Sequence, residues 1–190
     1  MSMITFVRQG ATAIALGALH ATGAAVLGFV LLPGATATAQ DAPTPAPKPC
    51  SGPEHRQFDY WIGEWDVTTP DGKAAGTNRI ASILGGCVLY ESWRSTSGKS
   101  EGHSFNVYGR DGKWHQTWVD NGGTLLELVG GPEAGRMVMS QERVGPDGKK
   151  ALHEISWTKL ETGQVKQHWR VTTDGGETWN DAFVGIYTRK

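Results

Sequence analysis

The chain has 190 residues and a formal net charge of −1, with 18 lysines and arginines against 19 acidic residues. This balance, without a basic run, provides no electrostatic footprint for DNA or RNA, so we predict no nucleic-acid partner. Removal of an N-terminal leader would leave about 150 residues, enough for one domain with a buried core.

Residues 1–39 have the pattern of a secretory signal peptide. Arg8 is their only charged residue, a long apolar run follows it, and residues 37–39 read Ala-Thr-Ala, an A-x-A cleavage pattern before Gln40. An uncleaved membrane anchor is the alternative, because the apolar run approaches the ~20 residues that span a bilayer. We expect cleavage, no membrane insertion afterwards, and a periplasmic or secreted protein.

Residues 40–49 contain four prolines and are expected to form a disordered tether, so the folded domain spans residues 50–190. Export would favour a disulfide between Cys50 and Cys87. That bond would close a loop of about 37 residues and stabilise the fold by ~3 to 4 kcal/mol. Two buried thiols or a metal pair are the alternatives. Zinc is disfavoured, because no histidines stand at ligand spacing.

Residues 55–67 are rich in aromatic side chains. Phe58, Trp61 and Ile62 fall at i, i+3 and i+4, which is one apolar face of a short helix. Gly63 can adopt the left-handed conformation that ends such a helix, and the residues after it alternate in polarity as a strand does. We therefore predict a short N-terminal helix whose aromatic residues close one end of a β structure.

After Gly63, turn sequences recur regularly and separate ten segments rich in Val, Ile, Thr and Trp. The nine turns lie near residues 70, 85, 97, 110, 120, 130, 145, 161 and 173. No sustained helical period is present, so the connections are predicted to be hairpins in an antiparallel sheet. Closing the sheet removes its exposed edges. We predict an all-β, ten-stranded up-and-down barrel, with a two-sheet sandwich as the alternative.

The triplet Gly63-Glu64-Trp65 resembles the G-x-W opening of the calycin group, the lipocalins and their relatives. The ten-strand count is more similar to the fatty-acid-binding or nitrobindin type than to the eight-stranded lipocalins. The resemblance implies an arginine covering the tryptophan. Arg189 is the candidate, in a contact that would contribute ~0.5 to 2 kcal/mol. The alternative is a free C-terminal arginine.

Longer segments resemble a family of exported bacterial proteins of unknown function. They read FDYWIGEWDV, ILGGCVLYESW, SFNVY, WHQTWVD and DGGETW, and together they extend over nearly all of residues 50–190. This resemblance implies export but no biochemical role.

Two predicted strands place a glutamine and a tryptophan on one face: Gln116 with Trp118, and Gln167 with Trp169. The opposite face of the second strand is charged and should meet water, so these four side chains are predicted to point inward. An unpartnered buried amide costs ~1 to 3 kcal/mol, so inward glutamines imply a polar network or a wet cavity.

Other strands complete an amphiphilic lining of the kind that small-molecule sites have. The predicted ligand-binding residues are Glu91, Trp93, Gln116, Trp118, Arg143, Gln167 and Trp169. Alternatively, Glu91 and Arg143 end their strands in solvent and the tryptophans fill the core.

No cofactor and no metal are predicted. Nitrobindin-like barrels bind haem through a histidine, but only His103 and His153 are expected to face inward, and each is more typical of an ordinary core or rim histidine. The segment TTDGGETW resembles the Asp-box of sialidase-type propellers. We predict that here it is a hairpin clasp in which Asp174 accepts N–H groups of the turn.

No recognised catalytic motif follows residue 40. We predict an exported barrel that holds a small apolar or amphiphilic molecule in its interior. A cofactor-free lyase, isomerase or hydrolase in the same cavity is an alternative, with Glu91 as acid or base because burial would raise its pKa. Tyr90, Asp120 and Glu154 are weaker candidates. A structural or interaction module with a filled core is the third possibility.

Overall fold

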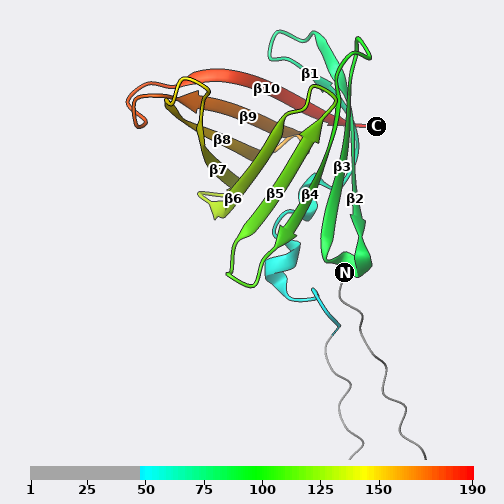
Figure 1. Cartoon of the computed structure of the whole chain (residues 1–190). Coiled ribbons are helices and arrows are strands. Elements are labelled where there is room, and N and C mark those ends of the chain that lie inside the picture. The colour runs from blue at the N-terminus through cyan, green and yellow to red at the C-terminus, as the bar shows by residue number, and fades with distance from the viewer. Residues whose placement is uncertain (1–47) are drawn as a thin grey trace, which may run out of the picture. The chain divides into compact units, whose positions relative to one another are not determined.

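The computed structural model describes residues 48–190, so the predicted signal peptide and most of the tether lie outside the described residues. Ten antiparallel strands form a closed barrel in which each strand pairs with its sequence neighbours and β1 pairs with β10 (Figure 1). The strands are β1 Gly63–Thr68, β2 Ala74–Ile83, β3 Val88–Ser95, β4 Glu101–Tyr108, β5 Trp114–Asp120, β6 Leu125–Glu133, β7 Arg136–Val144, β8 Lys150–Lys159, β9 Val165–Thr172 and β10 Asn180–Arg189. The predicted all-β up-and-down barrel is confirmed and the sandwich alternative is wrong. No helix within residues 48–190 is long and apolar enough to cross a membrane.

The barrel closes between its first and last strands, where Trp65 lies opposite Arg189. The guanidinium carbon of Arg189 is 4.4 Å from the centre of the Trp65 ring, and Nη1 donates a hydrogen bond to the Ile62 carbonyl at 3.0 Å. Gly63 has φ +151°, and a Cβ there would lie 2.2 Å from Nη1 of Arg189. The predicted arginine contact is confirmed. Gly63 makes room for it as the first residue of β1, so the predicted role of ending a helix is wrong.

The closing segment is made of two short 3-10 helices, η1 Pro53–Arg56 and η2 Asp59–Trp61, in place of the single helix predicted. Phe58 separates them with φ −109° and ψ 6°, and Ile62 is already extended, with ψ 130°. Ile62 therefore lies outside the helical turn. The segment still closes one end of the barrel (Figure 1, cyan), and its residues Phe58 and Trp61 are fully buried there, as predicted.

The closed end is packed by aromatic rings. Phe58 stacks on Trp61 with ring centres 4.8 Å apart, and it meets Trp114 and Trp157 edge-on at 5.7 and 5.3 Å. The Tyr60 hydroxyl donates to the carbonyl of Trp157 at 2.7 Å. Burial raises the pKa of Tyr60 to about 12, so it remains a hydrogen-bond donor at neutral pH.

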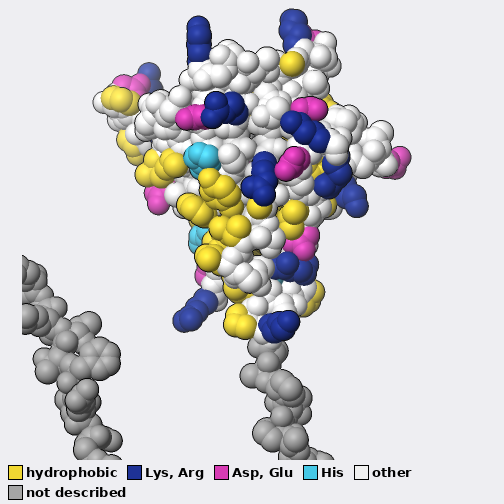
Figure 2. All heavy atoms as spheres, turned by 90° about the vertical axis from the view of Figure 1, so that its right-hand side faces the viewer, with side chains coloured by type: hydrophobic (Ala, Val, Ile, Leu, Met, Phe, Trp, Pro, Cys, Tyr) yellow, Lys and Arg dark blue, Asp and Glu magenta, His cyan; other side chains and the backbone are white. Residues whose placement is uncertain are grey.

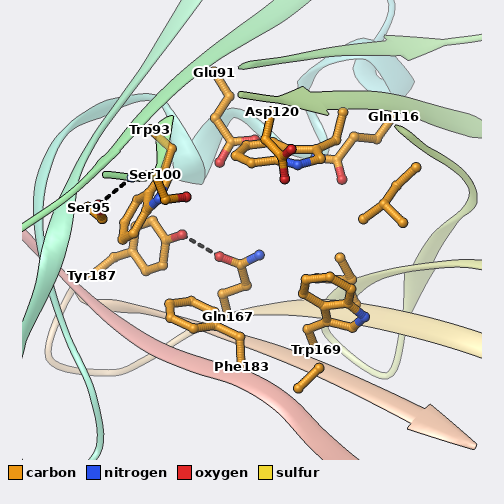
Figure 3. A pocket seen from close by; sticks show the side chains of 14 residues that line it. Glu91, Trp93, Ser95, Ser100, Gln116, Asp120, Gln167, Trp169, Phe183 and Tyr187 are labelled. Atoms are coloured by element: carbon orange, nitrogen blue, oxygen red, sulfur yellow. Dashed lines mark hydrogen bonds between the residues drawn. The ribbon is translucent and has the colours of Figure 1, made fainter. Parts of the chain in front are cut away.

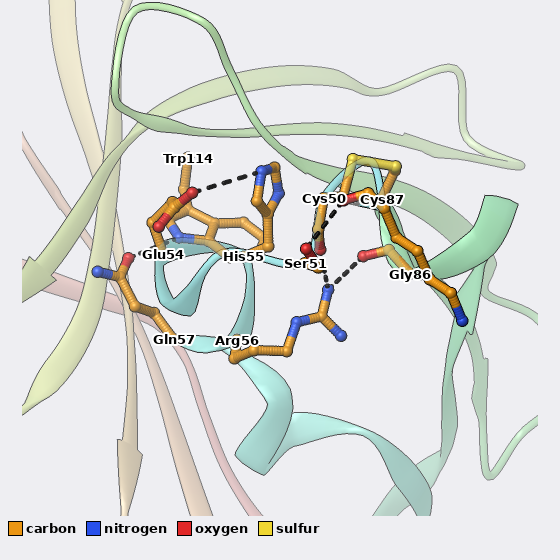
Figure 4. Close-up of polar contacts among 10 residues, drawn as sticks. Cys50, Ser51, Glu54, His55, Arg56, Gln57, Gly86, Cys87 and Trp114 are labelled. Atoms are coloured by element: carbon orange, nitrogen blue, oxygen red, sulfur yellow. Dashed lines mark hydrogen bonds and ion pairs between the residues drawn. A yellow bond between two sulfur atoms is a disulfide. The ribbon is translucent and has the colours of Figure 1, made fainter. Parts of the chain in front are cut away.

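A covalent and polar latch fastens the closing segment to the barrel (Figure 4). Cys50 and Cys87 form a disulfide with an S–S distance of 2.03 Å, which confirms the predicted pairing. The Arg56 guanidinium donates to the carbonyl of Cys50 at 3.4 Å and to that of Gly86, in the connection between β2 and β3. A disulfide is consistent with an oxidising compartment outside the cytoplasm. Export itself stays a prediction.

Two turn predictions are confirmed. The turn predicted in residues 130–135 lies at the end of that segment, at Ala134 and Gly135, whereas Gly130 belongs to β6 and lies so close to β7 that a Cβ there would be 2.0 Å from the Val138 carbonyl oxygen. The Asp174 clasp is confirmed, since its carboxylate accepts the backbone N–H of Thr178 at 3.0 Å. Hydrogen bonds from neighbouring hydroxyl and N–H groups hold the pKa of Asp174 far below its ordinary value.

Candidate functional site

A cavity of about 330 Å³ occupies the end of the barrel opposite the closing segment (Figure 3). Six of the seven predicted ligand-binding residues line it: Glu91, Trp93, Gln116, Trp118, Gln167 and Trp169. The remainder of the lining comes mainly from β5, β6, β8 and β10 and from the rim between β3 and β4. The interior is therefore lined, and not filled, by side chains at this end.

The space exists because three aromatic rings extend over inward-facing glycines. The pairs are Trp93 with Gly76, Trp118 with Gly102, and Phe183 with Gly185. A Cβ on any of these glycines would lie 2.3 to 2.8 Å from the ring. The rings consequently lie along the barrel wall instead of crossing its interior. These glycines were not predicted as part of the site, although a glycine within a strand pattern is itself a signal of close approach.

Four of the lining residues form what we call the aromatic collar: Trp93, Trp118, Trp169 and Phe183. Trp93 and Phe183 meet edge-on with ring centres 6.1 Å apart. Nε1 of Trp169 donates to Nδ1 of His153 at 3.2 Å, which fixes the indole against β8. The collar thus surrounds the cavity with ring surfaces whose positions are set by neighbouring strands.

Below the collar lies a group that we call the polar floor: Glu91, Gln116, Gln167 and Tyr187. Glu91 is 4% exposed, and its two carboxyl oxygens accept hydrogen bonds from Asn78 Nδ2 at 2.7 Å and Ser104 Oγ at 2.6 Å. Burial raises the pKa of Glu91 to about 7, and these two hydrogen bonds offset part of the increase. The carboxyl group therefore titrates near neutral pH.

The predicted polar network is present beneath the cavity. Gln116 Nε2 donates to Asn106 Oδ1 at 2.8 Å, and Asn106 Nδ2 donates to Ser104 Oγ at 2.9 Å. Ser104 then donates to Glu91, so the donors run toward the carboxyl group. Asn78, Ser104 and Asn106 were not predicted from the sequence as members of this network. Their signal was available, because each occupies an inward position of its strand.

The amides at the floor have unused hydrogen-bonding capacity. The Tyr187 hydroxyl donates to Gln167 Oε1, and burial, followed by the charge of Glu91, raises the pKa of Tyr187. Within residues 48–190, no side chain or backbone group is hydrogen-bonded to Gln167 Nε2 or to Gln116 Oε1. Both glutamines line the cavity, so one donor and one acceptor are available to a ligand.

Arg143, the seventh predicted residue, does not line the cavity, so the cavity gives its predicted role in ligand binding no support. The pairing of β6 with β7 ends at Val129 and Ser140, whereas β7 follows β8 as far as Val144. Arg143 therefore lies in the part of β7 that pairs with β8 but no longer with β6. Its charge, after burial, helps to lower the pKa of His153.

His103 faces outward, contrary to the prediction, and so does Tyr90. The two rings stack with centres 5.5 Å apart, and the Tyr90 hydroxyl is 2.8 Å from Nδ1 of His103. Glu154 does not line the cavity, and its Oε1 accepts a hydrogen bond from Arg170 Nε at 2.9 Å. Of the weaker acid–base candidates, only Asp120 lines the cavity.

The outer surface of the barrel is mixed in character. Figure 2 shows hydrophobic and histidine side chains together on one face, with acidic and basic side chains scattered around them. Phe105, Val119 and Leu125 are 51, 47 and 46% exposed on neighbouring strands. These three side chains do not line the cavity.

Within the described part of the chain, no three His, Cys, Asp or Glu side chains are grouped so that they could hold one metal ion. Comparison with protein-family models finds no match, and comparison with curated protein sequences finds none either.

Proposed function

We propose that this protein binds a small apolar or amphiphilic molecule in the cavity of its barrel. The observation that carries the proposal is the vacant space of about 330 Å³ between the aromatic collar and the polar floor. Its volume and its mixture of apolar walls with few polar groups match those of small-molecule sites, which run from about 300 to 1,000 Å³. The vacant space argues against the alternative of a filled structural core.

We further propose that the barrel is of the calycin type and that the protein is exported. The G-x-W triplet, the arginine stacked on its tryptophan and the closing 3-10 segment support the first proposal. The Cys50–Cys87 disulfide and the signal-like N-terminal sequence support the second.

A blocked cavity tests the binding function. N-phenyl-1-naphthylamine, a neutral dye that fluoresces strongly in apolar surroundings, serves as the probe. Ala182 lies at the cavity mouth and is exposed, so Ala182→Trp should fill the mouth and weaken probe binding at least about tenfold by steric exclusion. Thr117→Trp, at an exposed outward position of β5, is the matched control and should leave probe binding unchanged.

Equal weakening by both tryptophan variants would place the probe elsewhere and contradict the proposal. Native mass spectrometry of the gently purified protein provides a second measurement. We expect a small molecule to be retained by the unaltered protein and lost from the Ala182→Trp variant.

The raised pKa of Glu91 favours a second candidate function, an acid–base enzyme without a cofactor. A carboxyl group with a pKa of about 7 can both donate and accept a proton at neutral pH, and this one lines the cavity. In that case Glu91→Gln would abolish turnover of the substrate while preserving its binding. A pure binding protein has no turnover to lose.

A further inference from the structure

We propose that the ligand of this cavity carries a positively charged amine, which Glu91 binds at the polar floor while the aromatic collar surrounds the ligand's apolar body. This inference rests on the proposed binding function and specifies the chemical class of its ligand.

The first support is the sign of the charges along the wall. Two ionisable carboxyl groups, those of Glu91 and Asp120, line the cavity, and none of the lining residues in the described chain is a lysine, arginine or histidine. Asp120 Oδ1 accepts the backbone N–H groups of Gly122 and Thr124 at 2.9 Å each. These bonds keep the pKa of Asp120 below its ordinary value, so the mouth carries a negative charge at neutral pH. An anionic head group would meet two carboxyl groups and no cation.

Arg143 and His153, which lie on β7 and β8, do not alter that balance. Arg143 does not line the cavity, because β7 no longer pairs with β6 beyond Ser140. His153 is held with Nδ1 facing the Trp169 indole N–H, and its pKa is lowered by burial and by Arg143. A neutral imidazole accepting that bond supplies no positive charge to the cavity.

The second support is the hydrogen-bonding character of the floor. The donors that reach Glu91 come from Asn78 and Ser104, which lie outside the cavity lining. Facing the ligand, Glu91 and Gln116 Oε1 are acceptors, Gln167 Nε2 is a neutral donor, and the one group of the floor that can carry a charge is the Glu91 carboxylate. An ammonium group has three donors and no acceptor, and a bond from it to a carboxylate is charge-assisted. The floor is therefore better matched to an ammonium head than to a carboxylate or phosphate.

The third support is the collar itself. A cation within about 6 Å of an aromatic ring face is attracted by the ring quadrupole, more strongly when both are removed from water. Three indole rings and Phe183 line the cavity with Glu91, and three of these four rings, those of Trp93, Trp118 and Phe183, lie over glycines along the barrel wall. Apolar and cationic parts of one molecule would both be accommodated here.

Three probes that share one body separate the head groups. We would measure displacement of N-phenyl-1-naphthylamine at pH 8 by 4-phenylbutylamine, 4-phenylbutan-1-ol and 4-phenylbutanoate. We expect the amine to bind about tenfold more tightly than the alcohol, and the carboxylate about tenfold more weakly than the alcohol. Glu91→Gln should bring the amine to within about threefold of the alcohol, because the charge is removed while the shape is kept.

Glu127→Gln is the matched control, since Glu127 is exposed on β6 and does not line the cavity. It should keep the full preference for the amine. Equal affinity of the unaltered protein for amine and alcohol, or tighter binding of the carboxylate, would overturn the amine proposal and leave the binding function standing. Failure of the unaltered protein to bind the dye or any of the three compounds would overturn the binding function itself. The ranking in the unaltered protein remains decisive even if Glu91→Gln does not fold.

Discussion

Tryptophan has opposite roles at the two ends of this barrel. At the closed end, Trp61 and Trp157 are fully buried and pack against other rings. At the open end, Trp93 and Trp118 extend over glycines and bound an empty space. Because the residue type is the same at both ends, the residue on the adjacent strand determines whether an indole fills the interior or lines it.

The indole N–H groups of the closed end are not all satisfied. Within residues 48–190, the buried Nε1 atoms of Trp61 and Trp157 have no hydrogen-bond partner, whereas Nε1 of Trp114 donates to Gln57 Oε1 at 3.1 Å. A buried donor without a partner costs about 1 to 3 kcal/mol. The apolar packing of Trp61 and Trp157 must therefore exceed that penalty.

The largest expected effect comes from truncating one tryptophan at each end. Trp61→Ala should lower the free energy of unfolding by about 3 to 5 kcal/mol, because it leaves a cavity inside a packed aromatic cluster. Trp169→Ala should lower it by only about 1 kcal/mol, since the half-buried ring already borders empty space. Urea unfolding followed by circular dichroism measures both.

Probe binding should show the reverse order. Trp169→Ala is expected to weaken binding of N-phenyl-1-naphthylamine, and the folded fraction of Trp61→Ala to bind it normally. Trp61→Phe is the control, because it keeps an aromatic ring and removes the unpartnered N–H, and we expect it to be less destabilising than Trp61→Ala. Comparable losses of stability from Trp61→Ala and Trp169→Ala would contradict the division between a filled and an open end.

The open end also differs from the closed end because it holds a buried carboxyl group, that of Glu91. The dependence of the free energy of unfolding on pH tests this difference. Glu91 has a pKa of about 7 in the fold against an ordinary value of 4.5. Between these values the folded protein binds more protons than the unfolded chain, so the free energy of unfolding falls as pH rises and levels off above pH 7. The decrease should be at most about 3 kcal/mol for a shift of this size.

Glu91→Gln isolates this contribution. His153, whose pKa is lowered, contributes with the opposite sign in the same pH range, and it remains in both proteins. The difference in stability between the two proteins should therefore change between pH 4.5 and 7 and stay constant above. A constant difference across the whole range would mean that Glu91 is not buried as an ionisable group.

The sequence predicted the parts of this structure that depend on periodicity. Turn spacing indicated ten strands, and alternation correctly placed Gln116, Trp118, Gln167 and Trp169 inside. Arg143 shows where alternation stops being sufficient. It has the inward register of Met137 and Met139, but β7 parts from β6 after Ser140, and strand separation leaves no mark in a pattern of single residues.

The vacant cavity could not be predicted for a related reason. Whether Trp118 crosses the barrel or lies along its wall depends on Gly102, which is 16 positions away in the sequence and adjacent only after β4 pairs with β5. Gly76, Asn78 and Ser104 could have been recognised as inward residues. Their joint effect, a polar floor beneath a glycine-backed collar, arises only from the register of several strands.

The smallest expected effect concerns Trp65, which is covered by Arg189, the residue opposite it where β1 pairs with β10. Arg189→Leu should lower the free energy of unfolding by about 1 kcal/mol, through loss of the cation–π contact and of the bond to Ile62. Lys190→Leu is the control, because it removes a neighbouring cation that pairs with exposed Asp66 at 3.4 Å. We expect it to change stability by a few tenths of a kcal/mol at most.

A double-mutant cycle sharpens this last prediction. Gly63→Ala should be destabilising in the unaltered protein for two reasons: its φ of +151° and the Arg189 guanidinium that occupies the position of a Cβ. In the Arg189→Leu background a shorter, more compliant side chain stands there, so only the backbone strain remains. Gly63→Ala should then be less destabilising than in the unaltered protein, and strictly additive effects would show that the glycine is required for its backbone conformation alone.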